Sequence, residues 1–482
     1  MKQSDPLSNA AAHAAAFSRE LDSMRAGTQV GHAELLGRLG GELPESGLYP
    51  ERVVDELVAA TSDARHGSAG GRFFAWVIGG GFPSAVAADW LASVWDENAA
   101  HFAGAPAASV IEEVVGEWLK DLFRLPAEAS FALTSGCQMA HFTCLASARE
   151  ALMRRCGWDV NRQGLAGAPV IRILSGVDRH ASVDRALRFL GLGSDSIVTV
   201  EADDQGRIHV DALANDFERT KLPTIVVLSA GELNTGSFDR FDQLIPLAKT
   251  HRAWVHIDGA FGIVSRSSEQ FLPLSDGLEL ADSWATDGHK WLNVPLDSGL
   301  AFVRDRDAHR RAMSVETDYL EPCHSARDAI DWTPEWSRRA RGYALYAAIR
   351  EQGRGGIEKL VDRCCQHAAN LVDHVGRLPG VDVAVRPTLN QGLLRFLDPR
   401  VDDQGAHDEF TDQVIHRVNQ TGEAFFGGTT WRGKRVMRVS VVNWRTSEQD
   451  VRRAVGAIER VLHSAAEASR PERLVSQATP TR

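Results

Sequence analysis

The chain has 482 residues, of which 44% are hydrophobic and 24% are charged, a balance that is typical of globular proteins and excludes a fibrous or wholly disordered chain. This length predicts two or three domains. The net charge of -11 comes without a long basic run, which argues against a nucleic-acid or anionic-membrane partner, so any anionic ligand must be held by a local site.

The cysteines and the start of the chain bear on the compartment. Six cysteines are few for this length, and no CxxC pair is matched by a second one, so we expect neither a metal site nor a disulfide framework. Residues 1–20 lack the apolar stretch of a secretory signal peptide, and no apolar run reaches the roughly 20 residues that span a bilayer. These features predict a cytoplasmic protein with no membrane partner.

The N-terminal part, 1–105, is expected to be mainly helical, with helices over 7–38 and 86–100. The segment 67–85 is rich in glycine and also carries large aromatic residues, namely Phe73, Phe74 and Trp76. Flexible linkers rarely contain such side chains, so we expect a loop that is fitted against the rest of the protein.

From 106 to 376, short apolar strands alternate with helices. Strands are predicted at 170–175, 196–201, 224–230, 253–258 and 298–305. Helices are predicted at 108–123, 137–156, 181–190, 210–219, 239–250 and 335–376. This alternation favours an α/β fold with a mostly parallel sheet that is covered by helices on both faces. Ligands of such sheets bind at the carboxyl ends of the strands, here near 175–180, 231–234 and 258–261.

The last part of the chain has a different pattern. Strands at 393–398 and 436–443 alternate with helices at 406–420 and 446–467, which predicts a small α+β domain over 377–470. Residues 471–482 are polar and begin with a proline, so we expect them to form a disordered tail.

Lys290 has an unusual setting for a surface lysine. Polar and small residues precede it in the segment SWATDGHKWL, and a tryptophan and a leucine follow. The simpler interpretation is a loop lysine whose ammonium group is solvated. The functional interpretation is an imine between Lys290 and a carbonyl cofactor, which needs an amine on a rigid, partly buried turn.

Asp258 ends an apolar strand in the segment HIDGAFG. A carboxylate at this position is often only the N-cap of a following helix. The alternative is that it pairs with the pyridine nitrogen of pyridoxal phosphate (PLP), which keeps the ring protonated as an electron sink. Ala260 would then offer a flat apolar face to the ring. An aspartate at a strand end followed 32 residues later by Lys290 is more specific than either residue alone.

Two further segments fit the same cofactor. A helix is predicted to start directly after Gly136, and its free N–H groups at Gly136, Cys137 and Gln138 can hold a phosphate, with His289 nearby. An ordinary N-cap is the competing interpretation. His180 comes after a predicted strand and before an amphipathic helix, so it either caps that helix or stacks on the cofactor ring.

Together these segments resemble the group II PLP-dependent decarboxylases, which include aromatic-amino-acid and glutamate decarboxylases. The resemblance covers about 70–470. It rests on the stretches TSGCQMAHFTCLA, DRHASVDRALRFLGLG, GELNTGSFDRFDQL, HIDGAFG and SWATDGHKWL.

The resemblance implies the type I fold of PLP-dependent transferases, with a mostly parallel seven-stranded sheet, a helical N-terminal segment and a small α+β C-terminal domain. It also implies a homodimer whose active sites are shared between the subunits. By position, Lys290 would be the Schiff-base lysine, Asp258 the partner of the pyridinium nitrogen and His180 the stacking residue. The other implied cofactor contacts are Gly136, Cys137, Gln138, Ala260, Asp287 and His289.

The chain also departs from the family. Glu232 stands where decarboxylases often have a small hydroxyl residue, and Cys137-Gln138 replaces a pair of small residues. Decarboxylases use a tyrosine on a mobile loop to protonate the α-carbon after CO2 leaves. Trp332 falls at that position here, with Tyr319 and His324 as possible substitutes.

The expected activity is therefore α-decarboxylation of an L-amino acid. The alternatives are oxidative deamination to an aldehyde, transamination or another lyase reaction, and a paralogue that binds PLP without catalysis. Phe73 and Trp76 suggest a pocket for an apolar or aromatic side chain, although such residues are more often core. Arg438, on a strand of the small domain, either binds the substrate α-carboxylate and thereby favours proton abstraction, or is a structural residue that bonds the neighbouring loop.

Overall fold

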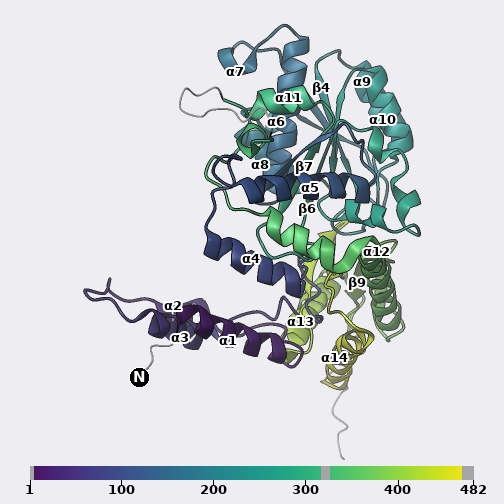
Figure 1. Ribbon diagram of the computed structural model, residues 1–482. Coiled ribbons are helices and arrows are strands. Elements are labelled where there is room, and N and C mark those ends of the chain that lie inside the picture. Colours follow the sequence, from purple (N-terminus) through teal and green to yellow (C-terminus); the bar gives the residue numbers. More distant parts are fainter. Residues whose placement is uncertain (1–4, 316–325, 469–482) are drawn as a thin grey trace, which may run out of the picture.

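The computed structural model describes residues 5–315 and 326–468 (Figure 1). The tail that the sequence predicts at 471–482 lies outside the described residues. Among the described residues, no helix has both the length and the apolar character needed to cross a membrane.

The N-terminal helices are α1 (Pro6–Glu20), α2 (His32–Leu39) and α3 (Pro50–Thr61), and they extend away from the body of the molecule (Figure 1). The predicted continuous helix over 7–38 is wrong in its middle, because residues 21–31 are not helical. Ala26 donates its N–H to the Gly422 carbonyl at 2.9 Å. Contacts with a distant segment therefore break the helix, and local sequence does not reveal them.

Two helices lead from this arm to the large sheet. Helix α4 (Pro83–Trp95) and helix α5 (Pro106–Leu122) both begin at a proline. Proline is favoured at the first helical position because its missing N–H would have no partner there. The predicted helix over 86–100 is thus present but starts earlier and ends at Trp95.

The large sheet has seven strands in the order β1-β7-β6-β5-β4-β2-β3. Its strands are β1 (Ser130–Thr134), β2 (Arg172–Gly176), β3 (Ile197–Val200), β4 (Thr224–Ser229), β5 (Trp254–Asp258), β6 (Ser283–Asp287) and β7 (Gly299–Val303). Only β7 runs antiparallel to its neighbours. The predicted mostly parallel seven-stranded sheet is confirmed.

Helices flank this sheet (Figure 1). They are α6 (Cys137–Arg155), α7 (Val160–Gln163), α8 (Ala181–Phe189), α9 (Val210–Glu218), α10 (Phe241–Thr250) and α11 (Arg306–Met313). Short 3-10 helices are η1 (Ser194–Ser196), η2 (Gly262–Ser267), η3 (Leu272–Ser275), η4 (Leu278–Leu280) and η5 (Ala329–Asp331). Strands β4, β5 and β7 are mostly apolar and buried, which explains why the alternation was readable in the sequence.

The sequence pattern does not predict β6. Its residues Ser283, Thr286 and Asp287 are polar, yet every residue of the strand is buried. They are buried because each has a partner: Ser283 Oγ lies 2.9 Å from Trp254 Nε1, and Thr286 Oγ1 donates to the Ala260 carbonyl at 3.3 Å. Burial of paired polar groups is acceptable in a core, but hydrophobicity patterns cannot detect it.

The second sheet is antiparallel, in the order β10-β11-β9-β8. Its strands are β8 (Val381–Val385), β9 (Gln391–Phe396), β10 (Gly427–Trp431) and β11 (Lys434–Ser440), and its helices are α13 (Gln404–Thr421) and α14 (Glu448–Ala468). The predicted α+β pattern is present, with β8 and β10 in addition to the predicted strands.

Helix α12 (Gly342–Val375) connects the two sheets. The sequence predicts that this helix starts at 335, but the residues before Gly342 are not helical. In this segment Arg338 is held by partners from other elements. Its guanidinium is buried and donates to Glu112 at 2.6 Å and to the Leu133 carbonyl at 2.8 Å. This buried ion pair ties the segment to α5 and β1 and excludes a helix there.

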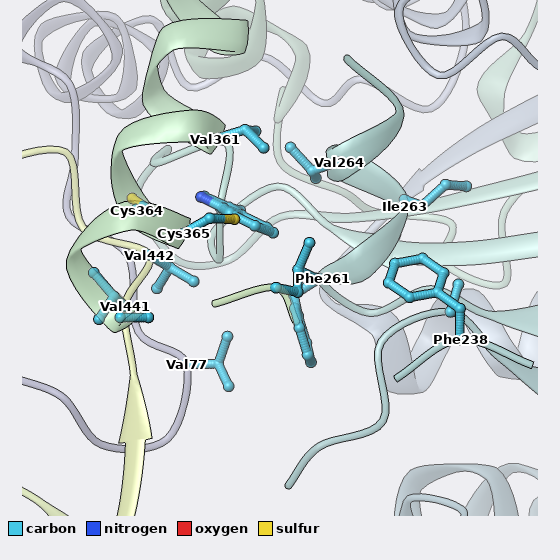
Figure 2. Close-up of a cluster of buried hydrophobic side chains, with 14 of the residues drawn as sticks. Val77, Phe238, Phe261, Ile263, Val264, Val361, Cys364, Cys365, Val441 and Val442 are labelled. Carbon is cyan, nitrogen blue, oxygen red and sulfur yellow. The ribbon is translucent and has the colours of Figure 1, made fainter. Parts of the chain in front are cut away.

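An apolar cluster joins the parts that surround the site (Figure 2). Val77 comes from the glycine-rich loop, Phe261 follows β5, Cys364 lies on α12 and Val441 follows β11. All four side chains are almost fully buried. Because close-packed cores deform little, this cluster fixes the loop, the end of β5 and the small sheet relative to one another.

Candidate active site

A cavity of about 210 Å³ lies where the carboxyl ends of β4 and β5 face the small sheet. Six residues that the sequence singled out line it: Trp76, His180, Asp258, Ala260, Lys290 and Arg438. These residues come from five separate parts of the chain. The fold therefore brings a lysine, an aspartate, a histidine and an arginine together at one rim, as expected for a parallel sheet.

Lys290 sits on the turn after β6, and its side chain is 20% exposed. Its Nζ lies 2.9 Å from Oδ2 of Asp287. Burial would lower the pKa of Lys290, but Asp287, Cys137 and Asp258 outweigh it and raise the pKa above its usual value. The side chain is thus an ion-paired group at the cavity wall rather than a solvated surface lysine.

The glycine-rich loop holds the turn that carries Lys290. A Cβ atom on Gly79 would lie 2.1 Å from the Lys290 carbonyl oxygen, so no larger residue fits. Gly80 donates its N–H to Oδ1 of Asn293 at 2.9 Å. Trp76 and Val77 both have a φ of 57°. This left-handed conformation is strained for bulky and β-branched side chains, and such strain is found most often at functional sites. This geometry agrees with the prediction of a fitted loop.

Asp258 ends β5 and is buried. Its Oδ1 accepts the Ala260 N–H at 3.1 Å, and its Oδ2 lies 3.6 Å from Nε2 of His141. Burial alone would raise the pKa of Asp258, but His141, His180 and Lys290 together hold it below the usual value. The group is therefore a carboxylate at neutral pH, even though little water reaches it.

His180 caps a helix, which is one of the two roles that the sequence left open, and stacking on the cofactor ring stays a prediction. It is the N-cap of α8, where its Nδ1 accepts the Ser182 N–H at 3.2 Å. Because Nδ1 is the acceptor, the neutral ring carries its proton on Nε2. His180 also lines the cavity, so the cap fixes the orientation of a ring that faces Lys290 and Asp258.

Arg438 lies on β11 and is only 8% exposed. Its Nε is buried without a hydrogen-bond partner among the described residues. Burial lowers the pKa of Arg438, and Glu232 partly offsets this. A buried guanidinium that lines a cavity and lacks a full set of acceptors is suited to binding an anionic group.

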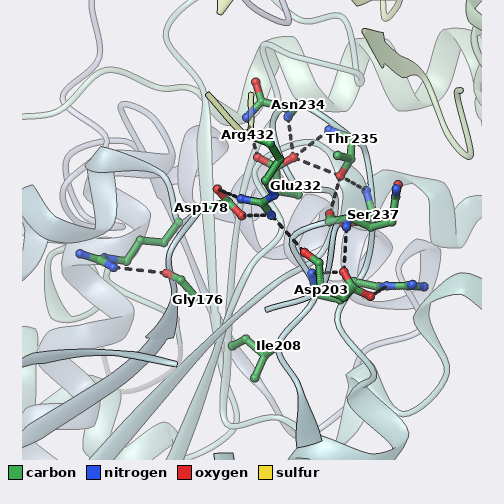
Figure 3. A network of polar contacts seen from close by, with 12 residues as sticks. Gly176, Asp178, Asp203, Ile208, Glu232, Asn234, Thr235, Ser237 and Arg432 are labelled. Carbon is green, nitrogen blue, oxygen red and sulfur yellow. Dashed lines mark hydrogen bonds and ion pairs between the residues drawn. The ribbon is translucent and has the colours of Figure 1, made fainter. Parts of the chain in front are cut away.

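A polar network surrounds Glu232 (Figure 3), which lines the same cavity as Arg438. The carboxylate of Glu232 accepts the N–H groups of Asn234 at 2.8 Å and Thr235 at 2.7 Å. Burial raises the pKa of Glu232 despite these bonds. Arg432, from the turn between β10 and β11, pairs with Asp178 at 2.8 Å. The network locks the loop after β4 and connects the small sheet to the large one.

The comparisons with known proteins agree with this geometry. A family model described as the pyridoxal-dependent decarboxylase conserved domain matches residues 53–391. The chain belongs to this family. An aromatic-L-amino-acid decarboxylase from Bacillus atrophaeus is 25% identical over 86% of this chain and 86% of its own length. An L-2,4-diaminobutyrate decarboxylase from Rhizobium meliloti is 27% identical over 78% of this chain and 74% of its own.

Among solved structures, the crystal structure of Oryza sativa TDC with PLP and tryptamine superposes with a TM-score of 0.89. It is 22% identical, and the match covers 96% of this chain and 98% of that one. The family, the type I fold, the carboxy-lyase class and the cofactor PLP, all predicted from the sequence, are confirmed.

The decarboxylase fold here presents donors that fit a phosphate group at the start of α6. Gln138 Nε2 is buried without a hydrogen-bond partner among the described residues, and the positive end of the helix dipole favours an anion there. Cys137 donates its N–H to Oδ1 of Asp287 at 2.5 Å, and Nε2 of His289 lies 3.5 Å from the same oxygen. Gly136 directly precedes these residues as the N-cap. The predicted phosphate residues thus lie together.

Phe73 and Trp332 do not line this cavity in the described chain. Phe73 is buried and stacks on Phe425, with 4.8 Å between the ring centroids. Trp332 is buried against His309, at 5.2 Å between ring centroids, beside a separate cavity of about 790 Å³. That cavity is larger but contains no amine near a buried carboxylate. Tyr319 and His324 lie outside the described residues.

Sequence reasoning assigned no role to His141 and His256. Both are fully buried, and Nδ1 of His141 lies 2.9 Å from Nε2 of His256. Cys137 Sγ, His141 Nε2 and an Asp258 oxygen also lie within 4.8 Å of one another, as a set of possible metal ligands among the described residues. The spacing in the sequence could have indicated these residues. His256 lies two positions before Asp258 and so on the same strand face, and His141 follows Cys137 by one helical turn.

Proposed function

We propose that this enzyme catalyses the PLP-dependent α-decarboxylation of an L-amino acid, with Lys290, Asp258 and His180 as the residues that hold and tune the cofactor. The observation that carries the proposal is that the amine of Lys290 and the buried carboxylate of Asp258 line one small cavity. The lysine amine can condense with the aldehyde of PLP, and the aspartate can pair with the nitrogen of its pyridine ring.

When bound, PLP supplies a carbonyl group for an amine and a protonated ring that accepts the electron pair of a bond broken at the α-carbon. The protein supplies the rest. Asp258 stays ionised and holds a proton at the ring nitrogen. Asp287 accepts a hydrogen bond from Nζ of Lys290 at 2.9 Å and so controls where this amine keeps its protons. His180 presents a flat ring whose orientation α8 fixes.

Arg438 is proposed to bind the substrate α-carboxylate. Its position would determine which bond at the α-carbon breaks: a carboxylate held out of the ring plane would leave as CO2, whereas one held in the plane would favour proton abstraction. Arg438→Gln should raise KM about tenfold to a hundredfold, because a charge-assisted hydrogen bond is lost. Initial rates with several amino acids check this: the rise should be similar for every one, since all share the α-carboxylate.

Arg435 supplies the matched control for Arg438. It lies on the same strand but pairs with Asp412 at 2.7 Å, away from the cavity. Arg435→Gln should leave KM unchanged. If Arg438→Gln affected only substrates with an acidic side chain, the arginine would bind that side chain and the α-carboxylate assignment would be wrong.

The substrate side chain is proposed to be apolar or aromatic. Trp76, Val77, Leu233 and Phe261 contribute apolar surface to the cavity, and apolar walls select such side chains. The relative from Bacillus atrophaeus is named for aromatic amino acids, which agrees with this assignment. The relative named for diaminobutyrate makes a cationic substrate the competing choice.

The deciding experiment is a panel of L-amino acids with mass-spectrometric detection of products. Amine and CO2 in equal amounts, best with aromatic or apolar substrates, support the proposal. Aldehyde together with ammonia and hydrogen peroxide would replace it with oxidative deamination, and keto acid without CO2 would replace it with transamination. A folded protein that binds no PLP and turns over nothing would end the proposal altogether.

A homodimer with shared active sites is also proposed. Helices α1, α2 and α3 contain no buried residue. Large apolar side chains on and near them and on α4 are exposed, including Leu36, Leu39, Tyr49, Val53, Leu57, Val94 and Trp95. Apolar area on this scale marks a protein interface. A second copy is the partner that the family resemblance indicates.

Val53 and Leu57 test the dimer because they lie one turn apart on α3 and are about half exposed. The double variant Val53→Glu, Leu57→Glu should shift the protein from dimer towards monomer in sedimentation velocity and lose activity in parallel. Glu56→Ala, on the same helix, is the control and should remain dimeric. A wild-type protein that sediments as a monomer at all concentrations would contradict the proposal.

A further inference from the structure

A line of buried polar groups runs from Asp258 into the core. His141 on α6 lies next to Asp258, His256 on β5 lies next to His141, and Ser283 on β6 lies next to His256. Nδ1 of His141 is 2.9 Å from Nε2 of His256, and Nδ1 of His256 is 2.9 Å from Oγ of Ser283. All three side chains are fully buried.

The hydrogen bonds in this line are favourable in only one direction of donation. Burial lowers the pKa of both histidines, so each ring is neutral, with one donor nitrogen and one acceptor nitrogen. If His141 donated to His256, its Nε2 lone pair would lie 3.6 Å from the Asp258 carboxylate and be repelled, with only the Cys137 thiol, a weak donor 3.4 Å away, to offset this. His256 must therefore donate to His141, which leaves an N–H on Nε2 of His141 pointing towards Asp258.

The far end of the line supports the same direction. Trp254 Nε1 can only donate, and it lies 2.9 Å from Oγ of Ser283. Ser283 thus accepts from Trp254 and is free to donate its own hydroxyl proton to Nδ1 of His256. Every bond from Trp254 to His141 then points towards Asp258, and bonds in such a chain polarise and strengthen one another.

We propose that His141 is a positioning residue for Asp258: as the last donor of the line, it holds this side chain as the carboxylate that keeps the cofactor ring nitrogen protonated. The inference rests on the proposed function. A donor next to a carboxylate stabilises the charged form. Without it, the buried Asp258 would take the proton from the ring nitrogen and leave a neutral, weaker electron sink.

The assignment also decides between two interpretations of the Cys137, His141 and Asp258 cluster. A metal ligand needs a lone pair, but Nε2 of His141 carries the proton. The cluster is therefore a hydrogen-bonded group. Helix α6 begins at Cys137, where the phosphate is expected, and carries His141 one turn later. One helix thus acts on both the phosphate end and the ring-nitrogen end of the cofactor.

The test uses the holoenzyme loaded with PLP labelled with ¹⁵N in the ring, so that the NMR shift reports the protonation of that nitrogen. The wild type should give the pyridinium signal. His141→Phe should move the signal towards neutral pyridine and lower kcat about tenfold to a hundredfold. His141→Gln, whose amide can still donate to Asp258, should restore most of both.

His309→Phe is the matched control. His309 is also fully buried and hydrogen-bonded, to Ser130 Oγ at 2.8 Å, but lies outside the cavity. It should leave the ring-nitrogen signal unchanged, which separates a local effect from general damage to the core. A pyridinium signal in folded His141→Phe would overturn the proposal.

Ser283→Ala is the second variant, in case His141→Phe does not fold. It removes the far donor while His141 stays in place, so a smaller shift in the same direction is expected. An unchanged signal would overturn the polarised line. The proposed function fails in a different way: either the product panel shows a reaction other than decarboxylation while the ring signal persists, or the wild-type protein binds no PLP and gives no ring signal at all.

Discussion

Lys290→Ala should reduce turnover on the order of 10³- to 10⁴-fold, because the variant loses both the amine that attaches the cofactor and a group that can move protons at the reacting carbon. Among the described residues that line the cavity, no other lysine is present. The measurement is kcat with the best substrate of the panel. Borohydride reduction of the wild type should attach the cofactor to Lys290 in a peptide map.

Lys290→Arg separates charge from chemistry. Arginine can keep the ion pair with Asp287, but its guanidinium stays protonated and does not condense with a carbonyl. The Lys290→Arg variant should therefore be as inactive as Lys290→Ala. Lys249→Ala removes a lysine that pairs with Asp282, which precedes β6 at the opposite end of the strand from Lys290, and it should behave as wild type. Borohydride labelling of any lysine other than Lys290 would refute the assignment.

The part of the site that lies at strand ends could be predicted from the sequence. Asp258 is the last residue of a buried strand and His180 lies four residues after the end of another, and the carboxyl ends of parallel strands share one rim. The order of the strands then determines that these residues meet. Lys290 follows β6, which the hydrophobicity pattern misses, and its position was inferred from its local motif and from the family resemblance.

The residues on loops were harder to place. Trp76 lines the cavity whereas Phe73, three residues earlier, stacks in the core. The difference arises at the positive φ of Trp76 and Val77, a backbone feature that sequence patterns do not reveal. Trp332 was aligned to a loop whose course depends on the buried pair of Arg338 and Glu112, and that pair connects segments far apart in the chain.

The histidine line shows a third limit. His141 and His256 are 115 positions apart, and a buried histidine is more often a core residue than a functional one. Their roles follow only from the packing of α6 against β5. The spacing in the sequence gives part of this arrangement. His256 lies on the same strand face as Asp258, two positions earlier, and His141 lies one helical turn after Cys137, at the phosphate end.

Asp258→Asn should fold normally and keep bound cofactor, yet lose turnover by about 10²- to 10³-fold, the cost of removing one preorganised charge from an active site. Asparagine has the same shape and can still accept the Ala260 N–H at 3.1 Å. It carries no negative charge, however, so nothing favours a proton on the ring nitrogen. Its amide group would also meet the N–H of His141, which adds repulsion.

A cofactor analogue methylated at the ring nitrogen makes this prediction specific. Its ring is permanently charged, so it does not need Asp258 to hold a proton there, and it should restore part of the lost turnover in Asp258→Asn relative to PLP in the same variant. Asp216→Asn, a change at a buried aspartate that pairs with Arg219 outside the cavity, should need no such rescue. Near-wild-type turnover of Asp258→Asn with ordinary PLP would mean that the ring nitrogen is not the electron sink, because a neutral side chain cannot keep that nitrogen charged in a site with so little water.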